Sequence, residues 1–429
     1  MKALILAGGK GTRLSEITQN QIPKPMAKIA GKMILEWAIK RLKEEGIHDI
    51  VISVGHMAEK IINHFEDGKA YGVNIEYIKE QFPLGSGGAL YYLKDMVEGD
   101  CLVCSGDTIF DIDIKRMLKY HRKKRAIATL LTHPNIHPYD SDLIVVNRHN
   151  RVLGIDKKDS VRDYYYHNNV NAGFFIFNKK ALEHLKEPAN INMEHDFIAS
   201  LIEDEEKVYA YRSSEFIKDV GTVERFRKVE QELLDNLVVE KKLSNAQKAI
   251  FLDRDGTINV YKGFITKKEE IELLPGVSEA IKKINQSGYL AIVVSNQPVI
   301  ARGEATFKEV EDMFAKIETL LGKEGAYLDG YYYCPHHPQK GFKGEIKRLK
   351  KVCDCRKPNI GLLLKAQKDF NIDLDKSWMI GDSTLDRKLA ENAHMPVILV
   401  ETGAQNSEEK YQAKDLEMAV NVILKEERV

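Results

Sequence analysis

Short apolar runs and longer amphipathic segments alternate along the chain, and this pattern predicts alternating strands and helices. Runs typical of buried strands occupy residues 2–7, 49–55, 100–107 and 170–178. Residues 33–46 instead carry apolar side chains at helical spacing and end at a glycine suited to a helix C-cap. Strands that alternate with helices are typical of a mostly parallel sheet covered by helices on both faces. We therefore expect an α/β fold.

The alternation is interrupted once, over residues 230–248, and then starts again. Charge rises there and strand signals vanish, so we expect a helix that runs into a polar linker. The later elements are helices near 277–287 and 306–321 and strands at 249–253, 289–296, 377–382 and 396–401. We predict two doubly wound α/β domains, residues 1–240 and 247–429, the first with a Rossmann-like mixed sheet.

Composition narrows this prediction by exclusion. The 429 residues include 64 Lys and Arg and 64 Asp and Glu, and the resulting zero net charge argues against nucleic acid or an anionic membrane as a partner. No apolar run approaches the roughly 20 residues of a membrane span. The first apolar run ends at Gly8, which is short for a secretory signal. We expect a cytoplasmic protein that binds small molecules, and leave open whether it forms a homo-oligomer.

Five cysteines indicate two different roles. An odd number in a chain without an export signal argues against a disulfide framework. Cys101 and Cys104 lie in a predicted strand, where free cysteine packs as a small hydrophobe. The other three stand in a Pro-rich region of low apolarity, which a structural zinc ion can fix in place of a core. The candidate ligands are Cys334, Cys353, Cys355 and either His336 or His337.

The first half places glycines and fixed charges at predicted strand ends. The strand at 2–7 runs into "LAGGKGTRL", whose glycines let the backbone approach a phosphate closely. Arg13 closes this loop, and Lys24 stands between two prolines that restrict its backbone. Asp107 and Asp219 each follow a strand beside glycine, and two such carboxylates suit Mg²⁺ on a triphosphate. We predict a nucleotide site.

These motifs occur in an order that resembles the sugar-1-phosphate nucleotidyltransferases. "LAGGKGTRL", "PKPM", "PLGSGGAL", "SGDT", "NAG" and "KDVGT" span about the first 235 residues. The resemblance points to the branch that acts on heptose 1-phosphate or mannose 1-phosphate, and it implies GTP as co-substrate. The sugar phosphate is then the nucleophile, and positioning, Mg²⁺ and cations supply the catalysis.

The resemblance also implies a role for each matching residue. It implies that Arg13 and Lys24 are catalytic and that Mg²⁺ binds Asp107 and Asp219. The implied nucleotide contacts are Leu6, Ala7, Gly8, Gly9, Gly11, Thr12, Arg13, Lys24, Gly85, Gly87 and Gly88, and the implied sugar-phosphate contacts are Lys157, Asn171, Gly173 and Glu194.

The second half carries a different set of acids. "FLDRDGTI" places Asp253 and Asp255 on one face of a strand end, where two acids repel unless a cation or a proton lies between them. Ser295 ends the strand of "VVSNQ", Lys357 follows Arg356, and Asp382 follows the strand of "MIGDSTLD".

This set resembles the haloacid dehalogenase superfamily of phosphatases. The resemblance implies that Asp253 attacks phosphorus and that Asp255 protonates the leaving oxygen and then activates water. It implies phosphoryl and substrate contacts from Ser295, Asn296, Gln297, Arg356 and Lys357, of which Ser295 and Lys357 also serve catalysis, and Mg²⁺ at Asp253, Asp255 and Asp382 with a main-chain carbonyl.

"CPHHP" and "CDCRKPNIG" resemble the heptose 1,7-bisphosphate phosphatases and their relatives, the histidinol-phosphatases. The resemblance implies zinc on Cys334, His336, Cys353 and Cys355. Three interpretations follow. The first is a bifunctional enzyme of nucleotide-heptose synthesis. The second is a mannose-type transferase fused to a histidinol-type phosphatase. The third is a transferase whose second half only regulates or assembles, against which the intact set of catalytic residues speaks.

Overall fold

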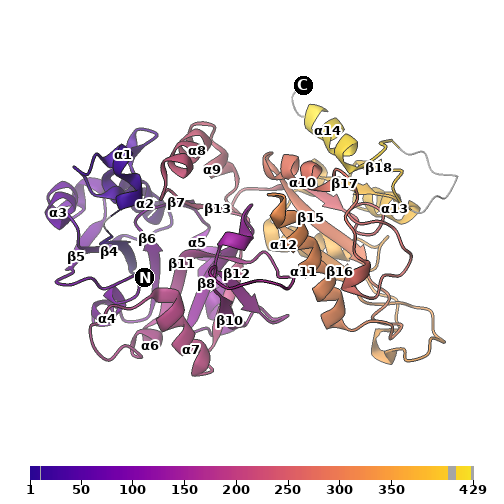
Figure 1. Cartoon of the computed structure of the whole chain (residues 1–429), viewed down its shortest axis with the longest axis horizontal. Coiled ribbons are helices and arrows are strands. Elements are labelled where there is room, and N and C mark those ends of the chain that lie inside the picture. The colour runs from indigo at the N-terminus through magenta and orange to yellow at the C-terminus, as the bar shows by residue number, and fades with distance from the viewer. Residues whose placement is uncertain (10, 404–411, 427–429) are drawn as a thin grey trace. The chain divides into compact units, whose positions relative to one another are not determined.

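The chain forms two compact units in a computed structural model that describes residues 1–9, 11–403 and 412–426. Unit 1 consists of Met1–His133, Ile144–Lys157 and Asn171–Lys242. Unit 2 consists of Leu243–Val429 together with two stretches from the first half of the chain, Pro134–Leu143 and Lys158–Val170. Figure 1 labels the helices and strands of both units.

Unit 1 is built on a nine-stranded mixed sheet, which confirms the predicted fold class. Its main path runs β10-β9-β11-β6-β1-β4-β5, with β8 beside β11 and β12 beside β8. β1 runs parallel to β4 and β6, whereas β11 runs antiparallel to β6. The strands are β1 (Ala3–Ala7), β4 (Asp49–Val54), β5 (Asn74–Lys79), β6 (Asp100–Ser105), β8 (Ala128–His133), β9 (Leu143–Val146), β10 (Val152–Asp156), β11 (Val170–Asn178) and β12 (Val208–Arg212).

Both faces of the unit 1 sheet are buried. Successive side chains of a strand point to opposite sides, so apolar neighbours in one strand join apolar clusters on different faces. In β1, Ala3 and Ile5 belong to one apolar cluster and Leu4 belongs to another. Cys101 and Cys104 are fully buried in β6, as predicted for packing residues. The helices of unit 1 include α2 (Ile34–Glu44), α3 (Ala58–Phe65), α5 (Ile114–Lys124), α8 (Val223–Leu234) and α9 (Leu237–Glu240). A short antiparallel pair, β7 (Thr108–Asp111) and β13 (Phe216–Asp219), lies off the main sheet.

Unit 2 contains a five-stranded parallel sheet in the order β16-β15-β14-β17-β18. Figure 1 labels all of these strands except β14. Ile250 and Leu252 of β14 join one apolar cluster, and Phe251 joins the cluster on the opposite face. The strands are β14 (Lys248–Leu252), β15 (Tyr289–Asn296), β16 (Gly330–Cys334), β17 (Trp378–Gly381) and β18 (Val397–Leu399), and the helices are α10 (Val277–Asn285), α11 (Phe307–Lys323), α12 (Gly361–Phe370), α13 (Thr384–Asn392) and α14 (Leu416–Glu426).

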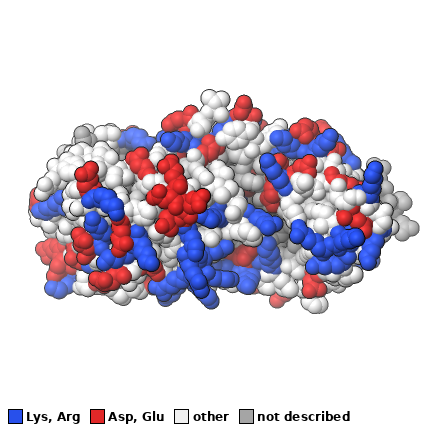
Figure 2. Space-filling model, turned by 90° about the horizontal axis from the view of Figure 1, so that it is seen from below, with Lys and Arg blue, Asp and Glu red and all other residues white. Residues whose placement is uncertain are grey.

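Among the described helices, none is long and apolar enough to cross a bilayer. On the face seen in Figure 2, basic and acidic side chains are interspersed, as the equal numbers of both signs lead one to expect.

Candidate active sites

One edge of the unit 1 sheet brings most of the predicted transferase residues together. Gly8 follows β1 and Asp107 follows β6, and these two strands run parallel. Because β11 runs antiparallel to β6, with Phe174 opposite Cys104, Asn171 and Gly173 at its start lie at this same edge. In the loop at 6–13, Lys10 lies outside the described residues.

Lys24 and Asp107 form an ion pair at this edge. Lys24 is only 7% exposed, and Ser105 Oγ donates a further hydrogen bond of 2.5 Å to Asp107 Oδ1. Burial on its own raises the pKa of Asp107, but the charge and hydrogen bond of Lys24 outweigh burial and leave that pKa below its usual range. Asp107 is therefore an anion that can bind a cation.

Three charged side chains lie around Gly221, which has no side chain of its own to separate them. A Cβ atom at Gly221 would lie 2.6 Å from Asp219 Oδ1, 3.3 Å from Lys24 Nζ and 3.5 Å from Arg13 Nη2. Asp219 is adjacent to Asp107, because Val220 N–H donates to the Asp107 carbonyl oxygen at 3.0 Å. The structure thus brings together Arg13, Lys24 and both aspartates, with two cations beside two anions.

Arg225 belongs to this cluster and was missed by the sequence reasoning. Its Nη1 donates to Asp219 Oδ2 at 2.6 Å from the first turn of α8, whose N-cap is Thr222. The available signal was positional: a residue three places after an N-cap lies in the first helical turn, beside the strand end that carries Asp219.

The glycines at 85–88 have a packing role that their predicted phosphate role did not include. Gly85 has φ +68°, and a Cβ there would lie 2.4 Å from the Ile191 carbonyl oxygen. A Cβ at Gly88 would lie 2.2 Å from the Ala189 carbonyl oxygen. Gly87 N–H donates to the Ile191 carbonyl at 2.8 Å. These glycines let two backbone segments approach closely.

The predicted sugar-phosphate residues lie in two places. Asn171 Nδ2 donates to Glu194 Oε1 at 3.0 Å, and Gly173, with φ +67°, has open space where a Cβ would stand. Lys157 is exposed immediately after β10. The open position at Gly173 leaves room for a ligand beside Asn171.

In unit 2, the carboxyl ends of three parallel strands carry the predicted phosphatase residues. Asp253 follows β14, Ser295 lies near the end of β15, and Asp382 follows β17. Ser295 is 1% exposed and Asp382 is 5% exposed. A Cβ at Gly403 would lie 1.8 Å from Asp382 Oδ2, so the absence of a side chain there makes room for this carboxylate.

Lys357 is the central cation of the second site. Its Nζ lies 2.8 Å from Asp253 Oδ1 and 2.7 Å from Asp386 Oδ1. Burial lowers the pKa of this lysine, but the two carboxylates outweigh burial and hold the pKa above its usual range. The amide of Asn296 fixes the Lys357 backbone, donating to its carbonyl at 3.1 Å and accepting from its N–H at 2.9 Å.

Asp386 was also missed by the sequence reasoning. It is fully buried in the first turn of α13, and Ser383 Oγ donates to its Oδ2 at 2.6 Å. Ser383 and Asp386 form the capping box of this helix. The signal was the spacing Asp382-x-x-x-Asp386 across a helix start, which brings two acids to one strand end.

Three carboxylates of this site could hold a metal ion. Asp253, Asp382 and Asp386 each offer an oxygen within 4.8 Å of the others. Burial and the negative charge of Asp386 raise the pKa of Asp253 well above its usual range, despite Lys357 nearby. Lys357 contacts two of these three carboxylates, and a cluster of carboxylate oxygens fits a hard divalent cation such as Mg²⁺.

The Asp255 carboxylate is outside this group, which differs from the predicted metal set. Fully buried Arg254 donates to its two oxygens at 2.8 and 2.7 Å. Asn259 and Gln297 donate to it at 3.0 and 3.2 Å. Arg254 holds the Asp255 carboxylate in this position, and a metal contact from Asp255 stays a prediction.

A second group of residues could hold a metal ion. It consists of Cys334 at the end of β16 and of His336, Cys353 and Cys355 in the loops. The sulfur atoms lie 3.3–3.5 Å apart, and His336 Nδ1 lies 3.3 Å from Cys355 Sγ and 3.6 Å from Cys334 Sγ. Ligands about 2.3 Å from a tetrahedral zinc are roughly 3.7 Å apart, so the spacing suits zinc.

His337 and Arg356 complete the description of this loop. His337 is half-buried and its Nδ1 contacts the Gln339 carbonyl at 3.2 Å, whereas His336 groups with the three cysteines, so the structure favours His336 of the two histidines that the cysteine spacing left open. Arg356 Nη1 donates to the His336 carbonyl at 3.1 Å, which links the cysteine loop to the segment that carries Lys357.

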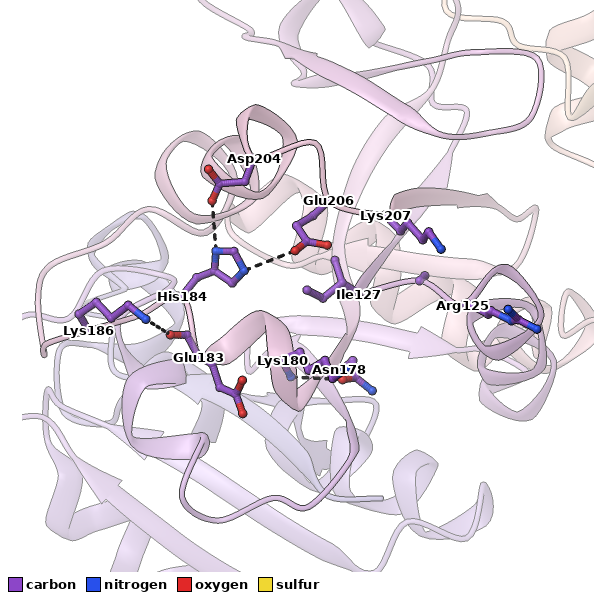
Figure 3. Close-up of a pocket in the computed structure, with 11 residues that line it drawn as sticks. Arg125, Ile127, Asn178, Lys180, Glu183, His184, Lys186, Asp204, Glu206 and Lys207 are labelled. Atoms are coloured by element: carbon purple, nitrogen blue, oxygen red, sulfur yellow. Dashed lines mark hydrogen bonds and ion pairs between the residues drawn. The ribbon is translucent and has the colours of Figure 1, made fainter.

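A pocket of about 870 Å³ in unit 1 lies away from these sites. It lies where β11 ends and where β8 and β12 begin, on the sheet edge opposite Asn171 and Gly173. In Figure 3, His184 lies between two carboxylates, Asp204 at 3.2 Å and Glu206 at 3.8 Å. None of the residues predicted for catalysis lines this pocket.

Comparisons with known proteins match both halves. The nucleotidyl transferase family matches residues 2–236, and a HAD-hydrolase-like family matches residues 354–422. The D-glycero-beta-D-manno-heptose-1,7-bisphosphate 7-phosphatase of Salmonella typhi is 41% identical over 168 residues, which are 39% of this chain and 87% of that protein. The protein of that name from Escherichia coli strain K12 is 40% identical, over 39% of this chain and 86% of its own length. The solved structure of HddC from Yersinia pseudotuberculosis has 24% identity and a TM-score of 0.47, over 54% of this chain and 99% of that one.

Proposed function

We propose that the chain makes a nucleotide-activated heptose in two steps. The premise is that it belongs to the nucleotidyl transferase family and to the family of D-glycero-beta-D-manno-heptose-1,7-bisphosphate 7-phosphatases. The chain is both a nucleotidyltransferase and a phosphatase. One observation carries the proposal: a nucleotidyl transferase half and a half related to heptose-bisphosphate phosphatases share one chain, and the product of the proposed phosphatase step is the substrate of the proposed transferase step. We assign the transferase to residues 1–240 and the phosphatase to residues 247–429.

The phosphatase step removes the 7-phosphate of D-glycero-D-manno-heptose 1,7-bisphosphate. An oxygen of Asp253 attacks phosphorus while the bond to the sugar oxygen breaks, and Asp255 gives that oxygen its proton. Water then attacks the aspartyl-phosphate and returns a proton to Asp255. Lys357 and Ser295 hold phosphoryl oxygens, and their burial beside Asp253 supports this role.

The transferase step joins heptose 1-phosphate to a guanylyl group. An oxygen of the sugar phosphate attacks the α-phosphorus of GTP, and pyrophosphate leaves. Arg13 and Lys24 stabilise the developing negative charge, and Asn171, Gly173, Glu194 and Lys157 hold the sugar phosphate. Because the nucleophile is already an anion, the absence of a base from the predicted residues is consistent with this chemistry.

Two kinds of metal complete the proposal, and both fit the residues present. In the transferase site, Mg²⁺ at Asp107 and Asp219 would neutralise negative charge. In the phosphatase site, Mg²⁺ would do so at Asp253 and Asp382, with Asp255 and Asp386 beside them. Zinc on the three cysteines and His336 fixes the loop, and its four ligands leave no position open for chemistry. We place the enzyme in the cytoplasm, where nucleoside triphosphates are available.

A phosphorus NMR time course tests the two-step proposal. Given heptose 1,7-bisphosphate, GTP and Mg²⁺, the chain should lose the 7-phosphate signal before the diphosphate linkage of GDP-heptose appears. Both anomers are compared. The guanylyltransferase resemblance implies the α-anomer, whereas the phosphatase relatives are named for the β-anomer. Preferred use of mannose 1-phosphate and histidinol phosphate would reject the heptose assignment.

A further inference from the structure

We propose that helix α11 of unit 2 sets the affinity of the transferase for its sugar phosphate by holding residues 158–170. This segment, here called the connecting segment, joins Lys157 to Asn171, two of the proposed sugar-phosphate contacts. The inference rests on the proposed function for the identity of those contacts. Its physical basis lies in the contacts that unit 2 makes with the connecting segment.

The connecting segment has almost no regular structure of its own. β10 ends at Asp156 and β11 begins at Val170, and no helix lies between them. Yet the segment groups with unit 2, and Tyr166, Asn168 and Asn169 are 8%, 0% and 4% exposed. An irregular segment is buried only where partners satisfy its polar groups.

Thr319 of α11 supplies the first set of partners. Its hydroxyl accepts a hydrogen bond of 2.8 Å from the Tyr166 N–H. Its single proton faces two acceptors, the Ala315 carbonyl oxygen of α11 at 2.8 Å and the Tyr166 carbonyl oxygen at 3.0 Å. Thr319 is 2% exposed. One side chain of α11 therefore satisfies the backbone N–H of Tyr166 and lies against its carbonyl group.

Glu318 supplies the second contact. This glutamate is fully buried, and its Oε2 lies 2.7 Å from His167 Nδ1. The His167 ring also stacks on Tyr331 with centroids 5.8 Å apart and an interplanar angle of 18°. Removing a partner from a buried carboxylate is costly, so this contact fixes the segment at one position.

The other stretch from the first half of the chain, residues 134–143, contacts both the connecting segment and helix α11. Asn168 exchanges two hydrogen bonds with the Asn135 backbone, at 3.0 and 2.7 Å. Arg162 donates to the carbonyl oxygens of Pro138 and Ser141 at 2.8 and 2.7 Å. A Cβ at Gly322 of α11 would lie only 2.5 Å from Pro138 Cγ. Gly322 is therefore required for this close approach.

The consequence for the transferase follows from chain connectivity. The two ends of the connecting segment are held by the stretch 134–143, which α11 contacts at Gly322. Lys158 N–H donates to Asp142 Oδ1 at 2.8 Å, and Val170 pairs with Leu143. Holding these ends restricts Lys157 and Asn171, which are bonded to them. If the segment were free, binding of the sugar phosphate would have to order it. The lost entropy would make the binding free energy less favourable, and the affinity for the sugar phosphate would fall. The nucleotide contacts at 6–13 and 85–88 have no such connection, so GTP binding should not change.

Gly322→Leu in the full-length protein tests this, with Lys323→Leu as the matched control because Lys323 is exposed on the same helix. Thr319→Val is a second variant that removes one hydroxyl. We expect Gly322→Leu, whose side chain would displace Pro138, to raise the KM for heptose 1-phosphate at least about tenfold, and Thr319→Val, which removes one hydrogen-bonding hydroxyl, to raise it severalfold. The KM for GTP, the phosphatase kcat/KM and the Lys323→Leu control should stay within about twofold of wild type.

Hydrogen exchange of residues 158–170, measured without substrate, separates the outcomes. Faster exchange in Gly322→Leu together with the raised sugar-phosphate KM supports the inference. Faster exchange with an unchanged KM overturns it, and so does unchanged exchange. A wild-type enzyme that uses no sugar 1-phosphate overturns the proposed function instead.

Discussion

The two catalytic edges differ in how they balance charge. In unit 1, Lys24 pairs with Asp107 and Arg225 pairs with Asp219, and the side chains of these aspartates are 31% and 44% exposed. In unit 2, Lys357 faces both Asp253 and Asp386, with Asp382 nearby, and the Asp386 side chain is fully buried.

This difference matches the chemistry of each site. A transferase whose nucleophile arrives with the substrate needs cations to position two phosphates, and its carboxylates can stay paired until Mg²⁺ arrives. A phosphatase that forms a covalent aspartyl-phosphate needs an anionic nucleophile in a dry site. The excess of carboxylates there makes the divalent cation a requirement, because like charges at this distance repel strongly.

The largest expected effect is that of Asp253→Asn. Loss of the nucleophile should lower the phosphatase kcat by at least about 10⁴-fold, as for other covalent catalysts. Transferase turnover of heptose 1-phosphate should stay normal, because Asp253 lies in unit 2 only. Parallel assays of phosphate and pyrophosphate release check this. If folded protein loses both activities, the two sites are not independent.

Asp107→Ala should have the reverse effect on a smaller scale. It removes a carboxylate and leaves Lys24 without its partner, so the transferase kcat/KM should fall roughly 10²–10³-fold. Phosphate release from the bisphosphate should not change. Wild-type transferase activity in this variant would show that Asp107 is not part of the metal site.

Asp386→Asn should weaken the phosphatase by about 10–100-fold, because one charge-assisted hydrogen bond to Lys357 is lost while the nucleophile remains. The conservative change keeps the shape of the side chain. Asp386→Glu serves as the charge-retaining comparison and should recover part of the rate. Equal kcat values for the asparagine variant and wild type would contradict the role given to Asp386.

His336→Ala and His337→Ala form a matched pair for the zinc prediction. The first should release zinc and lower the melting temperature by about 5–10 °C, whereas the second should change neither. Metal analysis of protein purified without added zinc gives the occupancy, with one ion per chain expected. Zinc retained in both variants would show that His336 is not a ligand.

The smallest effect concerns pH. The pKa of Asp253 is raised in the folded protein, so between its ordinary value and that raised value the folded state binds more protons than the unfolded one. Stability without Mg²⁺ therefore falls as pH rises through that window. Mg²⁺ favours the ionised carboxylates, so the gain in melting temperature on adding Mg²⁺ should increase as pH rises through the same window. A gain independent of pH, or the same gain in Asp253→Asn, would contradict this.

Local signals in the sequence were sufficient for much of this description. The alternation of apolar runs predicted both α/β sheets, since a strand buried on both faces needs a continuous apolar run. Observed bounds differ from the predicted ones by one or two residues, as at α2, because helix ends depend on capping contacts. Cys101 and Cys104 were assigned to the core on the same grounds and are fully buried.

Only the tertiary structure decided which charged groups meet. Nothing near Lys357 in the sequence indicates its contact with Asp386, which is 29 residues away, and nothing near Asp255 indicates its contact with Gln297, which is 42 residues away. It also decided that Thr319 and Glu318 bind a segment of the first half of the chain. The physical reason is that strand patterns and glycine turns are local properties of the chain. Pairing of buried charges depends on distances between residues far apart in sequence, which packing alone sets.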